Sequence, residues 1–201
     1  TLTSDRQCTE EATIVDSGLH SPHGIAITPT GGDLYVVEYT GKRVWHVNLA
    51  TNAKTEIRTL DSFGVGCALG NGGVLFVTQS SNGLVSKVEL TSPYAYSTAV
   101  SGLSRPVSVV LNEPKSVMYV AERSAHRVRR VLLNTDNTES SKEVAVTGIT
   151  SAEGLALSKD SSVLYVGQYA NPGSVWRVPL SASGTVAATD SMKIASGLNL
   201  P

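Results

Sequence analysis

Apolar and polar residues alternate in short runs along most of this chain, and the runs recur in a fixed order. One phrase, an aliphatic residue followed by an aromatic residue and valine, begins at residues 34, 75, 118 and 164, in steps of 41, 43 and 46 residues. The four copies read LYVVEYTGKRVWHV, LFVTQSSNGLVSKV, MYVAERSAHRVRRV and LYVGQYANPGSVWRV. A second phrase precedes each copy: PHGIAI at 22, VGCAL at 65, PVSVVL at 106 and AEGLAL at 152. Self-similarity at such a period indicates a repeat architecture.

Each repeat is predicted to contain four β-strands. In the first repeat these are expected at residues 24–27 (GIAI), 34–38 (LYVVE), 43–47 (RVWHV) and 54–59 (KTEIRT). Aromatic and β-branched residues recur at fixed points between glycine-rich and polar turns, which is a strand signal, and no stretch has a convincing helical period. Every repeat is expected to place an aromatic residue in its core: Tyr35, Phe76, Tyr119 and Tyr165. Four strands in about 40–50 residues form one blade of a β-propeller, so the fold class is all-β, a β-propeller with four encoded repeats.

The residue sequences of these phrases also resemble those of a known family. PHGIAI, LYVVEYTGKRVWHV and MYVAERSAHRVRRV are similar to NHL repeats, whose blades read roughly Pro-x-Gly-Ile-Ala, then Tyr-Val-Ala-Asp, then Asn-His-Arg-Ile. The resemblance extends over residues 13–201. It departs from the family where Glu and Gln replace the usual aspartate, at Glu38, Gln79, Glu122 and Gln168. Similar phrases occur in propellers of the gluconolactonase and strictosidine-synthase types.

The domain organisation follows from the repeats. Residues 1–12 are expected to be a polar leader and residues 13–201 the propeller domain, with repeats at about 17–60, 61–100, 101–146 and 147–195 and the start of a fifth at 196–201. Residues 10–16 (EEATIVD) resemble an outer strand. NHL-like propellers usually have six blades, whereas four are encoded here, so three arrangements are possible. The chain is part of a larger propeller, it forms an unusual four-bladed ring, or its blades are completed by copies of the chain through its terminal strands.

The amino-acid composition bears on the expected location and partners of the protein. The chain has 25 Ser and 19 Thr, only 16% charged residues and a formal charge of −1. A weakly charged, Ser/Thr-rich surface favours an extracellular location, and the near-neutral balance argues against nucleic acid as a partner. The longest apolar runs are about five residues, too short to insert across a bilayer. Two cysteines, Cys8 and Cys67, permit one disulfide, with a buried and inert Cys67 as the alternative.

Candidate chemistry is expected at the axial channel, beside the innermost strands. The residue before the small inner-strand residue is His23, Gly66, Val107 or Glu153 in the four repeats. The gluconolactonase-type resemblance implies a divalent metal at such positions, where His23 and Glu153 are the two candidate ligands. Hard cations need several oxygen ligands, so we expect no cofactor and keep one divalent cation such as calcium as the alternative.

Four aromatic residues break the repeat symmetry. Tyr39 and Tyr169 share one position and Trp45 and Trp176 another, whereas the other two repeats carry Ser or Arg there. Aromatic pairs of this kind suit protein contact or carbohydrate stacking if they reach the surface. The alternative is that they pack between neighbouring blades.

These features favour a non-enzymatic extracellular propeller that binds a protein partner or assembles with copies of itself. No Gly-x-Ser-x-Gly, His-Glu-x-x-His or Cys-x-x-Cys motif occurs, so no catalytic residue is assigned. A metal-dependent lactonase or esterase is the alternative, resting on His23, Glu153 and fold analogy. An RNA-binding NHL platform is the weakest hypothesis, because the basic cluster at residues 123–130 is confined to one repeat.

Overall fold

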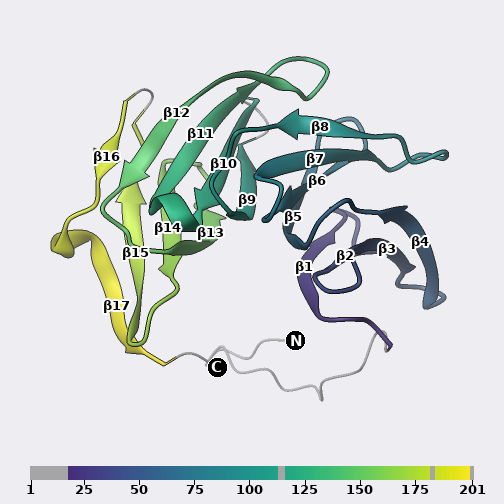
Figure 1. The fold of residues 1–201 in the computed structure, drawn as a ribbon, viewed down its shortest axis with the longest axis horizontal. Helices are drawn as coiled ribbons and strands as arrows, with labels where there is room; N and C mark the ends of the chain where they lie inside the picture. The colour runs from purple at the N-terminus through teal and green to yellow at the C-terminus, as the bar shows by residue number, and fades with distance from the viewer. Residues whose placement is uncertain (1–17, 113–115, 182–183, 200–201) are drawn as a thin grey trace.

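The computed structural model describes residues 18–112, 116–181 and 184–199. Their strands form four sheets arranged around a central axis (Figure 1). The only helical segments within these ranges are two 3-10 turns, η2 (Arg123–Ala125) and η3 (Asp190–Met192). The protein is therefore an all-β propeller of four blades, as the repeats predict. The predicted leader, Cys8 and the strand-like segment 10–16 lie outside the described residues.

Each blade is an antiparallel sheet whose four main strands run from the axis outward in chain order. Blade one contains β1 (Pro22–Ile27), β2 (Asp33–Glu38), β3 (Arg43–Asn48) and β4 (Ala53–Thr59). Blade two contains β5 (Gly64–Gly70), β6 (Val74–Gln79), β7 (Leu84–Glu89) and β8 (Tyr96–Val100). Blade three contains β9 (Pro106–Asn112), β10 (Val117–Glu122), β11 (Arg127–Leu133) and β12 (Glu139–Thr147). Blade four contains β13 (Ala152–Leu157), β14 (Val163–Gln168), β15 (Gly173–Pro179) and β17 (Lys193–Leu198).

Two details differ from the sequence-based expectation. A short fifth strand, β16 (Val186–Ala187), pairs in parallel with β12 at the outer edge of blade three. In addition, β17 continues through Leu198 and pairs with Gly173 and Ser174 of blade four. Residues 196–198, which the repeat pattern assigns to a fifth repeat, thus lie in the outer strand of the fourth.

Gly-Leu or Gly-Ile precedes the inner-strand phrase in three repeats, at Gly18-Leu19, Gly102-Leu103 and Gly148-Ile149, and Gly-Leu occurs again at Gly197-Leu198. This dipeptide has a conformational basis. Its glycine has a positive φ at each of four places: 77° at Gly18, 68° at Gly102, 85° at Gly148 and 73° at Gly197. A residue with a β-carbon is disfavoured in this left-handed region, so glycine suits the turns that follow β8 and β12, at Gly102 and Gly148, whereas Gly197 lies within β17 beside a register shift.

The hydrophobic core lies between successive sheets. Tyr35 and Val44 of blade one pack with Leu75 of blade two, and Phe76 of blade two packs with Met118 of blade three. The third cluster joins blades three and four, and includes Tyr119, Val128, Leu164 and Trp176. Each blade is therefore stabilised mainly by the burial of apolar side chains against its neighbours.

The two faces of each sheet have different roles. We name the face that carries the repeated aromatic residue the forward face, because it packs against the next blade. The backward face carries alternate apolar residues of the inner strand and packs against the preceding blade; in blades two to four these are Cys67 and Leu69, Val109 and Leu111, and Leu155 and Leu157.

The expectation that every repeat buries its aromatic residue is wrong for the fourth. Tyr35, Phe76 and Tyr119 are buried, whereas Tyr165 is only half-buried. Val175 is likewise half-buried, although the equivalent Val44 and its counterparts are fully buried. The reason is positional, since Tyr165 and Val175 lie on the forward face of blade four, where no further blade packs in the described structure.

Small residues let the inner strands approach one another around the axis. A β-carbon built on Gly24 would lie 2.6 Å from the carbonyl oxygen of Val65, and one built on Gly66 would lie 2.6 Å from that of Val107. At the next junction, Ser108 Oγ accepts a hydrogen bond of 3.2 Å from the Leu155 N–H. The strands β1, β5, β9 and β13 thus line the axis in series (Figure 1).

No helix in the described part of the chain has the length and apolar character needed to cross a membrane.

Candidate functional site at the axial mouth

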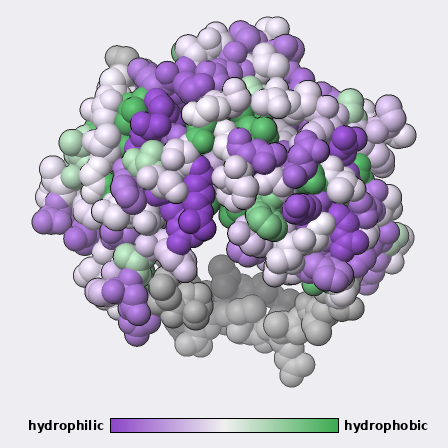
Figure 2. Space-filling model, viewed as in Figure 1, coloured by the Kyte–Doolittle hydropathy of each residue, from purple (hydrophilic) through white to green (hydrophobic). Residues whose placement is uncertain are grey.

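Several symmetry-breaking side chains, His23, Tyr39, Glu153 and Tyr169, lie at one end of the axis, where the inner strands begin and the second strands end. We name this region the axial mouth. A cavity of about 410 Å³ is lined by the inner strands of all four blades and includes His23 and Glu153. Figure 2 shows an opening near the centre of the molecule with hydrophilic side chains on its rim. The structure thus brings the two predicted channel residues to the same cavity.

Glu153 contributes a carboxyl group to the lining of the cavity at the mouth. Its Oε2 is buried and accepts no hydrogen bond from the described residues, while Arg123 Nε lies 3.4 Å away as an ion-pair partner. Burial raises the pKa of Glu153, and the positive charges of Arg123, Arg105 and His23 oppose that rise without cancelling it. Glu153 therefore holds its proton to a higher pH than an ordinary glutamate.

Arg123 is held from two sides. Its guanidinium lies 3.6 Å from the ring centroid of Tyr169, while its Nε faces Glu153. Its backbone N–H donates to the Arg105 carbonyl oxygen at 3.1 Å, which places the two arginines side by side at the start of blade three. Tyr169 is 45% exposed, so the cation–π contact is at the surface.

The opposite side of the mouth is an aromatic stack. The ring centroids of His23 and Tyr39 are 5.0 Å apart, and those of Tyr39 and Phe63 are 4.7 Å apart. Lys42 Nζ lies 5.1 Å from the centroid of Phe63. Because Tyr39 has a ring on each side, it positions His23 and offers little free face for carbohydrate stacking.

The two tryptophans lie away from the mouth. Trp176 is buried in the core between blades three and four, with Lys193 Nζ 4.7 Å from its ring centroid. Trp45 is half-buried on β3, between the cationic groups of Arg43 at 5.0 Å and Lys54 at 4.9 Å. The predicted Tyr-plus-Trp pairs are therefore separated, and only the tyrosines reach the mouth.

The residues at the mouth offer few ligands for a divalent cation. No three residues among His, Cys, Asp and Glu come together as ligands in the described ranges. Glu153 and His23 stand alone, and the positive charges of Arg105 and Arg123 act on the same carboxylate. A hard cation favours several oxygen ligands and would be repelled by these guanidinium groups. The calcium alternative stays a prediction that this geometry does not favour.

Cys67 lies on β5 beside the axial cavity and packs against the core between blades one and two. Burial raises the pKa of its thiol to about 12, so the side chain is protonated and unreactive near neutral pH. Its predicted partner Cys8 is outside the described residues, and the disulfide stays a prediction.

A second set of polar groups, one per blade, is structural. Glu38, Gln79 and Glu122 end the second strands of blades one to three and are fully buried. Each accepts a hydrogen bond from a backbone N–H at the start of its own blade: that of His20 at 2.7 Å, Ser62 at 2.9 Å and Ser104 at 2.7 Å. The side chains thus fasten the loop that leads into the inner strand.

The two carboxylates of this set make stability depend on pH. Burial raises the pKa of Glu38 and Glu122, but hydrogen bonds from Arg43 and the His20 N–H, and from Arg127, Arg129 and the Ser104 N–H, lower each pKa below its ordinary value overall. A carboxylate with a depressed folded-state pKa stabilises the fold fully above its unfolded pKa of about 4.3. That contribution is lost as the pH falls through the folded value.

We therefore expect the free energy of unfolding, measured by urea titration, to decrease as the pH is lowered from 5 toward 3. A Glu122→Gln variant should show a shallower decrease than the wild type. An equal slope in the two proteins would contradict the assignment.

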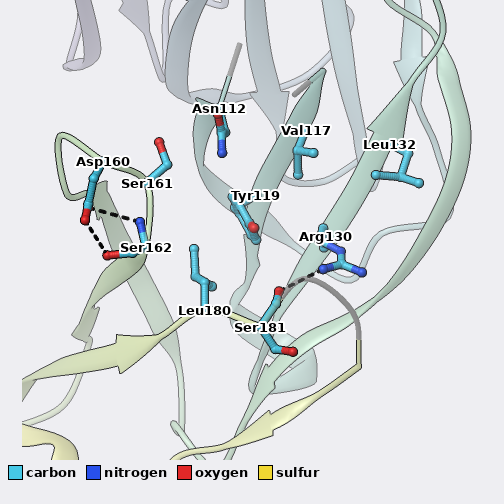
Figure 3. Close-up of a pocket in the computed structure, with 10 residues that line it drawn as sticks. All are labelled: Asn112, Val117, Tyr119, Arg130, Leu132, Asp160, Ser161, Ser162, Leu180 and Ser181. Carbon is cyan, nitrogen blue, oxygen red and sulfur yellow. Dashed lines mark hydrogen bonds between the residues drawn. The ribbon is translucent and has the colours of Figure 1, made fainter. Parts of the chain in front are cut away.

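A further cavity, of about 500 Å³, opens between blades three and four at the other axial end (Figure 3). Its charged groups already have protein partners. Arg130 Nη1 donates to the Ser181 carbonyl oxygen at 3.0 Å and pairs with Glu143, and Asp160 accepts hydrogen bonds from Ser158 and Ser162. The hydrogen bonds from these serines hold the pKa of Asp160 at about 2. The turn at Asp160 is thus internally satisfied.

Comparison with known proteins identifies the fold. No protein-family model and no curated protein sequence matches the chain. Among solved structures it is similar to Kuenenia stuttgartiensis hydrazine synthase, at 19% identity and a TM-score of 0.69 over 94% of this chain and 52% of the other. It is also similar to a candidate gluconolactonase, at 13% identity and a TM-score of 0.70 over 87% of this chain and 64% of the other. Virginiamycin B lyase from Staphylococcus aureus aligns at 15% identity and a TM-score of 0.61 over 88% of this chain and 55% of the other.

The shared feature is the propeller. The chain spans about half to two thirds of the length of these neighbours. At such low identity the likeness shows the fold alone, and it supports the predicted β-propeller without deciding between NHL repeats and a related repeat type.

Proposed function

We propose that this propeller is a non-enzymatic binding module that takes an acidic segment of a protein partner at the axial mouth. The observation that carries the proposal is the pairing of Arg123 with the poorly solvated carboxyl of Glu153. A half-buried carboxyl with a raised pKa is a weak competitor for its arginine, so a carboxylate of the partner can replace it.

Neighbouring charges favour the same class of ligand. Arg105 lies beside Arg123 and is exposed, and Lys42 and His23 lie on the aromatic side of the mouth. The Glu153 carboxyl lies within reach of the positive charges of Arg123, Arg105 and His23, and this local excess of positive charge favours approach of an anionic segment. The solved neighbours include proteins named as a synthase, a lyase and a gluconolactonase, so the fold by itself supports no single reaction.

The test uses a fluorescent hexaglutamate peptide, with hexaglutamine as the neutral probe, in an anisotropy titration. Wild-type protein is expected to bind hexaglutamate more tightly as the pH is lowered from 8, down to the point at which the peptide's own carboxylates begin to protonate (pKa about 4.3), because the raised pKa of Glu153 lets it take up its proton first and release Arg123. Arg123→Gln should weaken binding about tenfold or more, since a charge-assisted hydrogen bond is worth about 1.5–3 kcal/mol. Glu153→Gln should strengthen binding at pH 8 and flatten the pH dependence.

Lys159→Gln is the matched control, because it removes one positive charge from an exposed turn at the other axial end. It should bind hexaglutamate like the wild type. Equal affinity of the wild type for the two peptides would contradict the proposal. So would an equal loss of hexaglutamate affinity in the Lys159→Gln and Arg123→Gln variants.

A further inference from the structure

The interface between successive blades is built the same way three times. On the forward side the inner strand contributes a small residue, Gly24, Gly66 or Ser108, against which the next inner strand packs directly. The second strand adds the buried aromatic residue. On the backward side the next blade supplies two apolar inner-strand residues, such as Leu155 and Leu157.

Among the described residues, none packs on the forward face of blade four in the way that the next blade packs on blades one to three. The strand register places Gly154 at the position of Gly24 and Gly66, so the sequence-based alignment of Gly66 with His23 and Glu153 is wrong by one residue and Val65 is their counterpart. A β-carbon built on Gly154 meets no described atom within 4 Å. Ala156 beside it is exposed, and Tyr165 is half-buried. Glycine at position 24 or 66 is required by an approaching backbone, whereas the space toward which a β-carbon of Gly154 would point is open in the described structure.

Among the described residues, none packs on the backward face of blade one either. Ile25 is 67% exposed and Ile27 is 56% exposed, and they are the two most exposed large apolar side chains in the described ranges. They occupy the positions at which Leu155 and Leu157 pack against blade three. Large exposed aliphatic side chains on one strand mark an interaction surface.

The two unfilled faces are complementary halves of one interface type. We propose that blade four of one chain stacks on blade one of a second copy, so that the β1 strand of the second copy, with Ile25 and Ile27, packs against Gly154 and Tyr165. This contact continues the series of blade interfaces that already joins blades one to four. It is heterologous, so it generates a closed ring where the curvature allows and an open row of copies otherwise.

The contact surface adjoins the axial mouth, because Ile25 and Gly154 also line its cavity. Assembly is measured without any added peptide, so its outcome is distinguishable from that of the peptide titration. Sedimentation velocity and native mass spectrometry of the purified chain, up to roughly 100 µM, should detect species larger than the single 21.1 kDa chain. Gly154→Arg blocks the forward face of blade four, and the double change Ile25→Asp with Ile27→Asp blocks the backward face of blade one. Each variant alone is expected to be monomeric, with the dissociation constant raised on the order of tenfold or more.

Mixing the two variants supplies the decisive measurement. The double variant retains an intact blade-four face and the Gly154→Arg variant an intact blade-one face, so a mixture should form a one-to-one heterodimer. This result also proves that both variants fold. Leu132→Asp is the control, because Leu132 is 42% exposed on blade three, away from both faces, and its replacement should leave assembly unchanged.

A monomeric wild type over this concentration range would overturn the proposal. So would variants that assemble like the wild type, or two monomeric variants that fail to combine on mixing.

Discussion

Replacing Glu122 with alanine is expected to lower the free energy of unfolding by about 3–5 kcal/mol, the usual cost of removing one partner from a buried ion pair. One carboxylate oxygen accepts the Ser104 N–H at 2.7 Å, and the other accepts from Arg127 Nε at 2.5 Å and Arg129 Nε at 2.8 Å. The alanine would leave the Ser104 N–H unsatisfied and two guanidinium groups without their counter-charge. Urea unfolding followed by circular dichroism measures the change.

Two matched variants separate charge from hydrogen bonding. Glu122→Gln imitates blade two, where Gln79 accepts the Ser62 N–H, and should cost less than the alanine variant because one acceptor is kept. Glu56→Ala removes an exposed partner 3.9 Å from Arg43 and should cost at most about 1 kcal/mol. A Glu122→Ala loss as small as that of Glu56→Ala would show that the buried carboxylate does not hold blade three together.

The four-blade architecture is predictable because the core repeats. Every internal blade must bury an aromatic residue on its forward face and apolar residues on its inner strand, and this demand is written in the sequence at a regular period. The failure at Tyr165 has the same cause. A single sequence shows that the fourth repeat is equivalent to the others, but it does not show what lies against the last blade.

The sequence does not identify the hydrogen-bond and ion-pair partners of the buried polar residues at the ends of the second strands. Arg127 and Arg129 look like part of a basic strip in MYVAERSAHRVRRV, yet they converge on Glu122 from the adjacent strand. Strand pairing brings them together, whereas the Ser104 N–H reaches the same carboxylate from 18 residues upstream through the course of the chain. A pattern of residue types indicates that the carboxylate needs partners, and only the register identifies them.

The sequence predicts some of the residues at the axial mouth and misses others. His23 and Glu153 stand out because they break the repeat at an inner-strand position, and the structure places both at one cavity. Arg105 and Phe63 precede their inner strands in loops whose sequences differ between blades, so no alignment of the repeats singles them out. Arg123 breaks the symmetry at the position of Tyr39 and Tyr169, which is the signal that could have found it.

Gly66→Ala should lower the free energy of unfolding by about 1–3 kcal/mol, the range for overpacking a filled interior site. The added β-carbon would lie 2.6 Å from the Val107 carbonyl oxygen and 2.9 Å from Ser108 Cα, and both are backbone atoms that move only with the strand. Blades two and three must therefore separate slightly along the axis. Thermal unfolding at low protein concentration measures the effect.

Gly154→Ala is the matched substitution at the same repeat position, and its expected effect has the opposite sign. No described atom lies within 4 Å of the added carbon, so the variant should be about 0.4–1 kcal/mol more stable than the wild type as a single chain, because alanine reduces the entropy of the unfolded state. If a second copy packs there as proposed, the same methyl group should weaken assembly at high protein concentration. Equal losses of stability at positions 66 and 154 in the dilute monomer would mean that blade four already has a neighbour within its own chain, and would remove the basis for an open interface.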